Sequence, residues 1–267
     1  MRNLIVLLVA IYLVSCNNEN TSTNDNIFLN CENMLDDGIY FTSCEEVLDI
    51  SGLKMYPFLP FTDEEWRETD YSYKLERRQI PEEFLHSMTT KELFYQFVFT
   101  DLSGSMGVFN TRQQGFEAVT QQLNMLPELL NRPDAGHVLL ELLQKVDLSK
   151  IQLDMSREMD CYWWYYCLQI IGAQMEVINR MTNEDICAYI HHQLRCHDIM
   201  QSSNDYPENA ALLLYGLGNV MIRYKFEPFL QTLSRHPITN ELIWDTQFIK
   251  KQYALQVIDF VKQFKKD

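Results

Sequence analysis

Five residues with potential metal-binding side chains crowd one short stretch of the chain: Cys187, His191, His192, Cys196 and His197. Thiolate sulfur and imidazole nitrogen are the ligands that zinc prefers. On a helix, Cys187 and His191 share one face. His192 and Cys196 share a second face, about 140° away. Two pairs that point apart cannot form one tetrahedral site without a second segment, so we expect surface histidines, buried cysteines and no cofactor.

A second set of residues matches a metal-binding pattern. Asp101, Ser103 and Ser105 have an Asp-x-Ser-x-Ser spacing that resembles the metal motif of von Willebrand factor A-type domains. In such domains the carboxylate and the hydroxyls hold Mg²⁺ for an acidic ligand. The site also needs two further loops on a parallel sheet. One of these loops typically reads Thr-Asp-Gly, a sequence that this chain lacks. A metal-dependent adhesion domain is therefore the alternative interpretation.

The same stretch approaches the nucleophile elbow of serine hydrolases, Gly-x-Ser-x-Gly. Ser103 stands in place of the first glycine, and Ser105 would be the nucleophile. An elbow needs a strand before it, a helix after it, and a sheet that presents the acid and the histidine. No such sheet is visible, and a Gly/Ser turn between helices accounts for the residues. A hydrolase that uses Ser105 is the weaker alternative.

Two other patterns carry no enzymatic signal. Gly216 and Gly218 lack the third glycine of a dinucleotide-binding loop, because residue 221 is Met221, and no strand precedes them. Acidic residues are plentiful, but no spacing singles out a catalytic pair. We therefore expect a protein that is not an enzyme.

The beginning of the chain is typical of an export signal. One basic residue, Arg2, precedes an unbroken apolar run over residues 4–14. Eleven residues rise only about 16 Å as a helix, roughly half of a ~30 Å hydrocarbon core. The run is therefore too short to span a membrane and fits the core of a signal peptide.

The apolar run ends in Leu13-Val14-Ser15-Cys16, which resembles the bacterial lipobox. This resemblance implies cleavage of residues 1–15 and lipid on Cys16, with acyl chains such as palmitate holding the protein to a membrane. Residue 17 is Asn17, so the Asp that marks retention in the inner membrane is missing. The outer membrane is the expected location.

The remaining chain divides into a tether and one domain. Residues 17–26 contain no apolar side chain, so 16–29 is predicted to be a lipidated cysteine and flexible tether. No later linker interrupts 30–267, which we interpret as a single domain. The net charge is −15, and −16 once Arg2 is removed (21 basic minus 37 acidic residues). This balance argues against nucleic acid as a partner, because binding phosphates requires clustered Lys and Arg.

The domain is predicted to be all-α. Capping boxes begin at Ser43, Thr62 and Thr89, and Thr182 opens a weaker one. The apolar segment from Cys161 to Ile178 predicts a central helix. Short breaks suggest antiparallel helix pairs, with an α-solenoid as one arrangement. Helices are expected at 81–87, 90–99, 111–125, 134–147, 157–180, 183–200, 207–223, 226–234 and 246–265.

Six cysteines remain after lipidation, and export permits disulfides. Six cysteines allow fifteen pairings, which the sequence cannot distinguish. Cys31 and Cys44 are the expected local pair, because their bond would staple a turn-rich segment. The other four are expected to be buried and free: Cys161, Cys167, Cys187 and Cys196.

Several short motifs keep their order and spacing between residues 55 and 147. They are Ile80-Pro81-Glu82-Glu83-Phe84-Leu85, Met88-Thr89-Thr90 with Leu93, Gln114-Gly115-Phe116-Glu117-Ala118-Val119, and Leu130-Asn131-Arg132-Pro133-Asp134-Ala135-Gly136 with Leu139-Leu140. This pattern resembles a family of uncharacterised lipoproteins from Bacteroides-type Gram-negative bacteria. The resemblance implies the lipid anchor and a helical fold, and it carries over no functional residue.

The sequence as a whole predicts a helical protein held to the cell envelope through lipid on Cys16. A tether, an array of helices and the lack of a convergent catalytic set favour a binding or scaffold module. Its expected partners are the membrane, through the anchor, and a protein or glycan ligand.

Overall fold

The fold is all-helical in the residues that the structure describes. A computed structural model of the chain describes residues 31, 48–100, 103–109, 111–145, 148, 159–201, 211–233 and 251–265. Within these ranges there are thirteen α-helices and one 3₁₀ helix, and no strand. The all-α prediction is confirmed.

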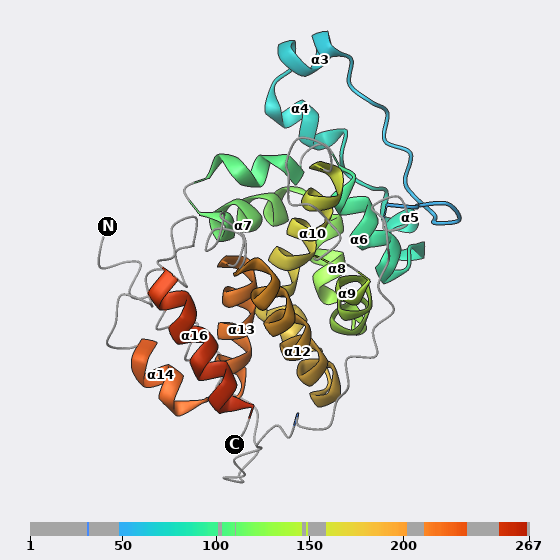
Figure 1. Ribbon diagram of the computed structural model, residues 1–267. Helices are drawn as coiled ribbons and strands as arrows, with labels where there is room; N and C mark the ends of the chain where they lie inside the picture. The colour runs from blue at the N-terminus through green and yellow to red at the C-terminus, as the bar shows by residue number, and fades with distance from the viewer. Residues whose placement is uncertain are drawn as a thin grey trace.

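Figure 1 labels most of these helices along the chain. In chain order, the helices are α3 (Asp63–Glu68), α4 (Tyr71–Glu76), α5 (Glu82–Ser87), α6 (Thr90–Val98), η1 (Ser103–Val108, 3₁₀), α7 (Arg112–Gln122), α8 (Met125–Asn131), α9 (Ala135–Gln144), α10 (Met159–Gly172), α11 (Met175–Ile178), α12 (Asn183–Met200), α13 (Ala211–Arg223), α14 (Glu227–Leu233) and α16 (Lys251–Phe264).

Three of the predicted capping boxes are present. Thr62, Thr89 and Thr182 each accept a hydrogen bond from the backbone three residues on, and the acidic side chain there accepts one from the cap. These reciprocal bonds satisfy amide groups that a helix start leaves open, which fixes where α3, α6 and α12 begin. The box predicted at Ser43 lies outside the described residues.

Two predicted long helices are each divided in the structure. The helix expected over 111–125 ends at Gln122, and Asn124 turns aside to accept a hydrogen bond from the amide of Ile80 and to donate one to its carbonyl. The helix expected over 157–180 ends at Gly172, where Asn219 of α13 donates to the carbonyl of Ala173 at 2.6 Å. At both breaks a side-chain hydrogen bond joins the chain to a segment far away in the sequence, which helical periodicity does not report.

Helix α10 lies at the centre of the fold, as its uniformly apolar sequence predicted. It packs against α6, α7, α9, α11 and α13 (Figure 1). Trp164, Leu168 and Ile171 are each at most 1% exposed. Burial on all sides explains why this helix has no polar face.

The C-terminal helices extend the same core. Helix α12 packs on α9 and α13, and α16 packs on α13 and α14 (Figure 1). Val257, Ile258 and Val261 of α16 face inward and are each at most 1% exposed. Among the helices described, none is both long and apolar enough to cross a bilayer.

Candidate binding surface

The structure places the segment around Ser103 against the helical core. Its hydroxyl donates to the carbonyl of Thr100 at 2.7 Å and accepts from the indole nitrogen of Trp163 at 3.0 Å. Ser103 is 2% exposed, so both bonds hold the chain together in the interior. Asp101 and the side chain of Ser105 lie outside the described residues.

The elements around Ser103 differ from those that either alternative site requires. Helix α6, rather than a strand, contains the apolar run from Phe94 to Val98, and the next described element is η1, which begins at Ser103. The backbone of Met106 in η1 lies so close to Gly115 of α7 that no side-chain carbon would fit there. No group of three metal-ligating side chains occurs in the part of the chain that the structure describes.

Cys187 and His191 lie on one face of α12 and His192 and Cys196 on another, as the spacing predicted. The expectation of surface histidines is wrong for His192 and His197, which are 1% and 0% exposed because that side of α12 is buried in the core. His192 and Cys196 form one pair, with the imidazole Nε2 3.4 Å from the sulfur, and both are at most 2% exposed. Tyr165, a core residue, is a neighbour of Cys196. Burial is the main cause of the raised pKa of Tyr165, and Cys196 raises this pKa further. Burial also raises the pKa of the free Cys167 thiol, which opposes formation of a nucleophilic thiolate.

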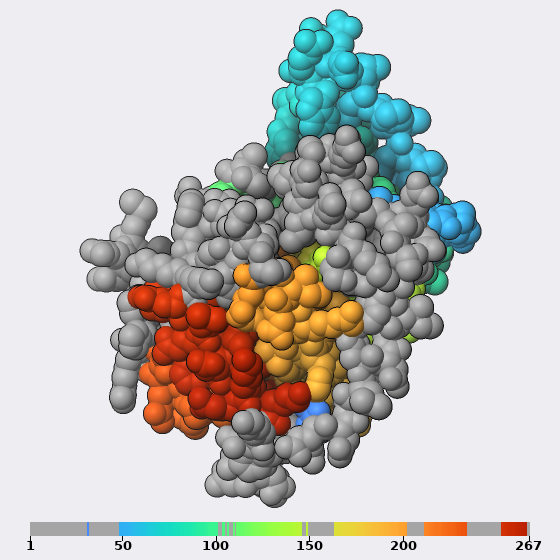
Figure 2. Space-filling model, in the orientation of Figure 1, coloured from blue at the N-terminus to red at the C-terminus, as the bar shows by residue number. Residues whose placement is uncertain are grey.

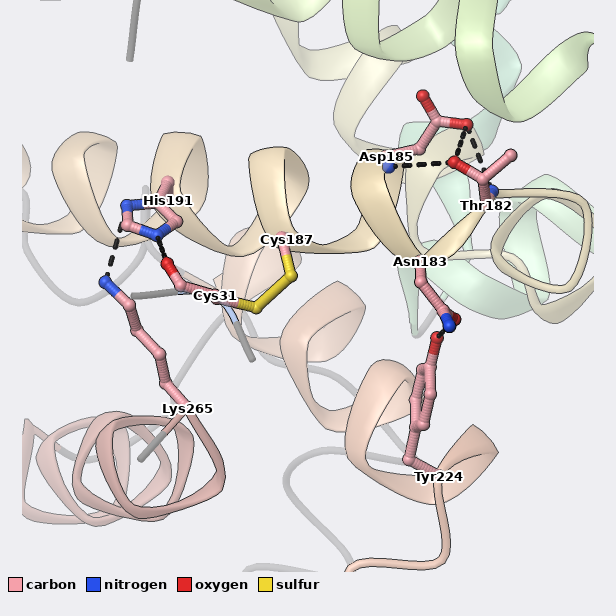
Figure 3. Close-up of a disulfide and its surroundings, with 8 residues drawn as sticks. All are labelled: Cys31, Thr182, Asn183, Asp185, Cys187, His191, Tyr224 and Lys265. Atoms are coloured by element: carbon pink, nitrogen blue, oxygen red, sulfur yellow. Dashed lines mark hydrogen bonds between the residues drawn. A yellow bond between two sulfur atoms is a disulfide. The ribbon is translucent and has the colours of Figure 1, made fainter. Parts of the chain in front are cut away.

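The other face of α12 carries a disulfide (Figure 3). Cys187 is bonded to Cys31, 156 residues away, with the Cα atoms 5.2 Å apart. His191, one turn further along, lies with Nε2 3.0 Å from the carbonyl oxygen of Cys31, and Lys265 Nζ is 3.4 Å from its Nδ1. The structure therefore fastens residue 31 to α12.

The predicted Cys31–Cys44 bond is wrong, because Cys31 is bonded to Cys187. Spacing favoured a local pair, but the fold, rather than separation in sequence, decides which sulfurs meet. The prediction that Cys187 is free is wrong for the same reason. Cys167 and Cys196 are buried and free, as predicted. Cys44 lies outside the described residues, as does the side chain of Cys161.

Gly216 has a packing role. A Cβ at Gly216 of α13 would collide with the hydroxyl of Tyr189, which reaches across from α12 and donates to the carbonyl of Gly172 at 3.3 Å. Glycine is needed here for the close approach of two helices. This contact accounts for Gly216 without a bound nucleotide.

One acid–histidine pair was not predicted. His137 Nδ1 lies 2.9 Å from an oxygen of Asp185, and Glu141 lies 3.5 Å from Nε2. The hydrogen bond to Asp185 is the main cause of a raised pKa for His137. The other oxygen of Asp185 accepts bonds from the backbone and hydroxyl of Thr182, so the pair serves the start of α12. Nothing in the sequence indicated that α9 and α12 would meet at these positions.

The most distinctive surface is a projecting arm, which we define as residues 56–78. Figures 1 and 2 show its helices α3 and α4 standing out from the body. Neither helix has a buried residue. Four large apolar or aromatic side chains are exposed along it: Leu59 (72%), Trp66 (40%), Tyr71 (44%) and Tyr73 (44%). The sequence analysis missed the arm, because only the capping box at Thr62 signalled it and exposure cannot be read from residue type.

The arm is joined to the body by polar contacts. At its start, the amide of Tyr56 donates to the side-chain oxygen of Gln96 on α6 at 2.6 Å. Further along, the hydroxyl of Tyr71 donates to Gln122 of α7 at 2.8 Å. Just after the arm, the side chain of Gln79 donates to the carbonyl of Gln122 at 2.7 Å. Within the arm, Arg78 is 2% exposed and donates to the carbonyl of Leu59 at 3.2 Å.

Stacked cations and rings stabilise the arm internally. The guanidinium carbons of Arg77 and Arg78 each lie 4.3 Å from the centre of the Phe61 ring. Lys74 Nζ lies 4.6 Å from the centre of the Trp66 ring. Such cation–π contacts contribute about 0.5–2 kcal/mol each. They replace the apolar core that segments of this size cannot build alone.

The arm therefore presents aromatic side chains to solvent, and polar and cation–π contacts hold its backbone in place. Exposed apolar surface of this kind, rimmed by polar groups, is typical of interaction sites. Trp, Tyr and Arg are also the residues that most often dominate the energy of protein interfaces.

No protein-family model, no curated protein and no solved structure matches the chain.

Proposed function

We propose that this protein is a non-enzymatic binding module of a bacterial cell envelope, anchored by lipid on Cys16, and that the arm is its contact surface. The observation that carries the proposal is the exposure of Leu59 before α3 and of Trp66, Tyr71 and Tyr73 on helices α3 and α4, which have no buried residue. A segment of this kind contributes little to the core. Its exposed rings are available for a partner.

The anchor and the finer architecture belong to the same proposal. The lipobox-like end of the apolar run at Cys16 supports lipidation, and the polar composition of residues 17–26 supports a tether. An outer-membrane location follows from Asn17. We also propose that the helices are arranged as antiparallel pairs, with an α-solenoid as one form of that arrangement, which is a common basis for binding surfaces.

A protein is favoured over a glycan as the ligand. Sugar rings stack on the open faces of aromatic side chains, and cations of the arm lie over two of its exposed rings. Lys74 lies over Trp66, and Arg77 lies 5.7 Å from the centre of Tyr73. These contacts reduce the ring surface on which a sugar could stack, whereas the exposed aliphatic side chain of Leu59 suits contact with the side chains of a protein.

The alternatives proposed from sequence have weaker support. A metal-dependent adhesion domain using Asp101, Ser103 and Ser105 needs a central sheet, as does a hydrolase using Ser105. The helix before Ser103 and the structural bonds of its hydroxyl weigh against both. Mg²⁺-dependent stabilisation that Asp101→Ala removes would favour the first, and labelling of Ser105 by a fluorophosphonate would favour the second.

Site-specific photo-cross-linking tests the binding function. A photoreactive phenylalanine at Tyr73, in the full chain expressed in a Gram-negative envelope, should form a discrete adduct with one protein. The same group at Leu255, which is 38% exposed on α16, is the control for random collisions. Equal adducts from both positions, or none from Tyr73, would contradict the proposal. Labelling with radioactive palmitate, lost in Cys16→Ala, tests the anchor separately.

A further inference from the structure

The charged side chains of the arm differ in exposure. Three of its four basic side chains contact the arm itself: Lys74 lies over Trp66, Arg77 lies over Phe61, and Arg78 is buried. Arg77 is also paired with Glu65 at 3.3 Å. These contacts hold the three cations against groups of the arm.

Most acidic side chains of the arm are exposed. Between residues 63 and 76 one basic side chain is exposed, that of Arg67. The exposed acidic side chains in the same range are Asp63, Glu64, Glu68, Asp70 and Glu76. Exposed carboxylates therefore outnumber exposed basic side chains by five to one in the range that also carries the exposed rings of Trp66, Tyr71 and Tyr73.

We infer that the partner of the arm is a protein surface that combines basic and apolar side chains. This inference rests on the proposed binding function and adds the chemistry of the partner. Apolar contact with the exposed rings supplies affinity, and opposite charge around it steers the approach and excludes wrong partners. A basic surface is the complement of exposed rings on an acidic segment.

Charge also decides against the other occupants of this surface. A second copy of the chain carries a net charge of −15 and would bring acidic groups against the acidic side chains of the arm. An anionic lipid surface would be repelled in the same way. A neutral glycan has no positive charge to pair with the acidic side chains of the arm. A basic protein surface satisfies both the rings and these acidic side chains.

Two matched peptides test the inference on the full-length chain in detergent. One is a dye-labelled dodecapeptide of three Lys-Leu-Leu-Lys repeats, and the other has Glu in place of every Lys. Fluorescence anisotropy should show binding of the basic peptide alone. Raising NaCl from about 50 to about 300 mM should weaken it, because salt screens exposed charge.

Variants locate the binding on the arm. Reversal of two exposed acidic charges in E64K/E68K should weaken binding of the basic peptide by about tenfold, and W66A/Y73A should abolish it. The control E83K/D259K makes the same change in charge on exposed positions of α5 and α16, and it should bind like the wild type. This control separates the arm from the general attraction of an acidic protein for cations.

The outcomes distinguish the inferred basic partner from the proposed binding function of the arm. Equal binding of the acidic peptide, lost in W66A/Y73A, overturns the basic partner but leaves the arm as a binding surface. If the basic peptide still binds W66A/Y73A, or if its binding falls equally in both charge variants, the inference is overturned. Either outcome also removes support for the arm as a binding surface. Failure of both peptides to bind also overturns the inference, whereas the cross-linking at Tyr73 still decides the binding function.

Discussion

The guanidinium carbon of Arg78 lies 4.3 Å from the centre of the Phe61 ring, while Arg78 itself is 2% exposed. A buried cation thus holds the extended start of the arm against the end of α4. The second ring near this guanidinium is Phe58, at 5.2 Å. Because α3 and α4 have no buried residues, this stack is a main support of the arm.

Replacing Arg78 with alanine should loosen the arm. The variant loses two ring contacts and the bond to the Leu59 carbonyl. The population of molecules in which the arm is locally unfolded should therefore rise by about tenfold. Limited digestion with chymotrypsin, which cleaves after Trp66 and Tyr71, measures that population. The control is Arg67→Ala, which removes an exposed arginine from the same arm. Equal cleavage of the two variants would contradict the role given to Arg78.

The disulfide should contribute much of the stability of the body. A bond between residues 156 apart constrains the unfolded chain, and the loop-closure model assigns such a loop about 5 kcal/mol. Cys187→Ser should lower the free energy of unfolding by about 2–5 kcal/mol, measured by urea denaturation. Cys31→Ser should lower it by the same amount, and the double variant should lose no more than either single variant, because each removes the same bond. Additive losses in the double variant would contradict this account.

Peptide mapping without reduction checks the pairing itself. The peptide containing Cys31 should be recovered joined to the peptide containing Cys187. Recovery of Cys31 joined to Cys44 would contradict the structure. The mapping needs no variant, so it is independent of the stability measurement.

Gly115 should not tolerate a side chain. An alanine Cβ would collide with the backbone carbonyl of Met106, and backbone cannot move aside cheaply. Gly115→Ala should destabilise the protein by about 1–3 kcal/mol. Gly104→Ala in η1, where nothing lies within 4 Å of the new carbon, should be neutral or stabilising by up to about 1 kcal/mol. Equal melting temperatures for the two variants would show that η1 does not pack on α7 in this way.

The pair of His137 and Asp185 should make stability depend on pH. The pKa of His137 is raised, mainly by its hydrogen bond to Asp185, so its charged form favours the folded state. This contribution is complete below the unfolded value of 6.5 and is lost as pH rises through the higher folded value. The wild type should therefore exceed His137→Gln in stability by more at about pH 5.5 than at about pH 8.5 in urea denaturation. A difference independent of pH would contradict the assignment.

Local signals in the sequence predicted most of the helices. Capping boxes gave the first residues of α6 and α12, and the apolar segment from Cys161 gave the central position of α10. Helix breaks were not predicted where a distant side chain causes them, as Asn219 does beyond the end of α10. No helix was predicted for the ranges of α3, α4 or α8. The capping box at Thr62 marked the start of α3, but α3 and α4 have no buried face to produce an apolar period.

The candidate site was less predictable than the fold. The separation of Cys187 from Cys196 onto two faces of α12 followed from helical geometry alone. The bond of Cys187 to Cys31 did not, because it depends on which segments the fold brings together. The exposure of Trp66 also depends on the fold, since an aromatic residue between polar ones can be core or surface.

Hydroxyl-radical footprinting in intact envelopes tests the central claim most directly. The rates of oxidation of Trp66, Tyr71 and Tyr73 would be measured in the envelope and in purified protein by mass spectrometry. Phe109 and Leu255, which are 39% and 38% exposed outside the arm, are internal controls. If the arm is the contact surface, its three rings are oxidised more slowly in the envelope while the controls are unchanged. Equal rates for the three rings in both preparations would contradict the account.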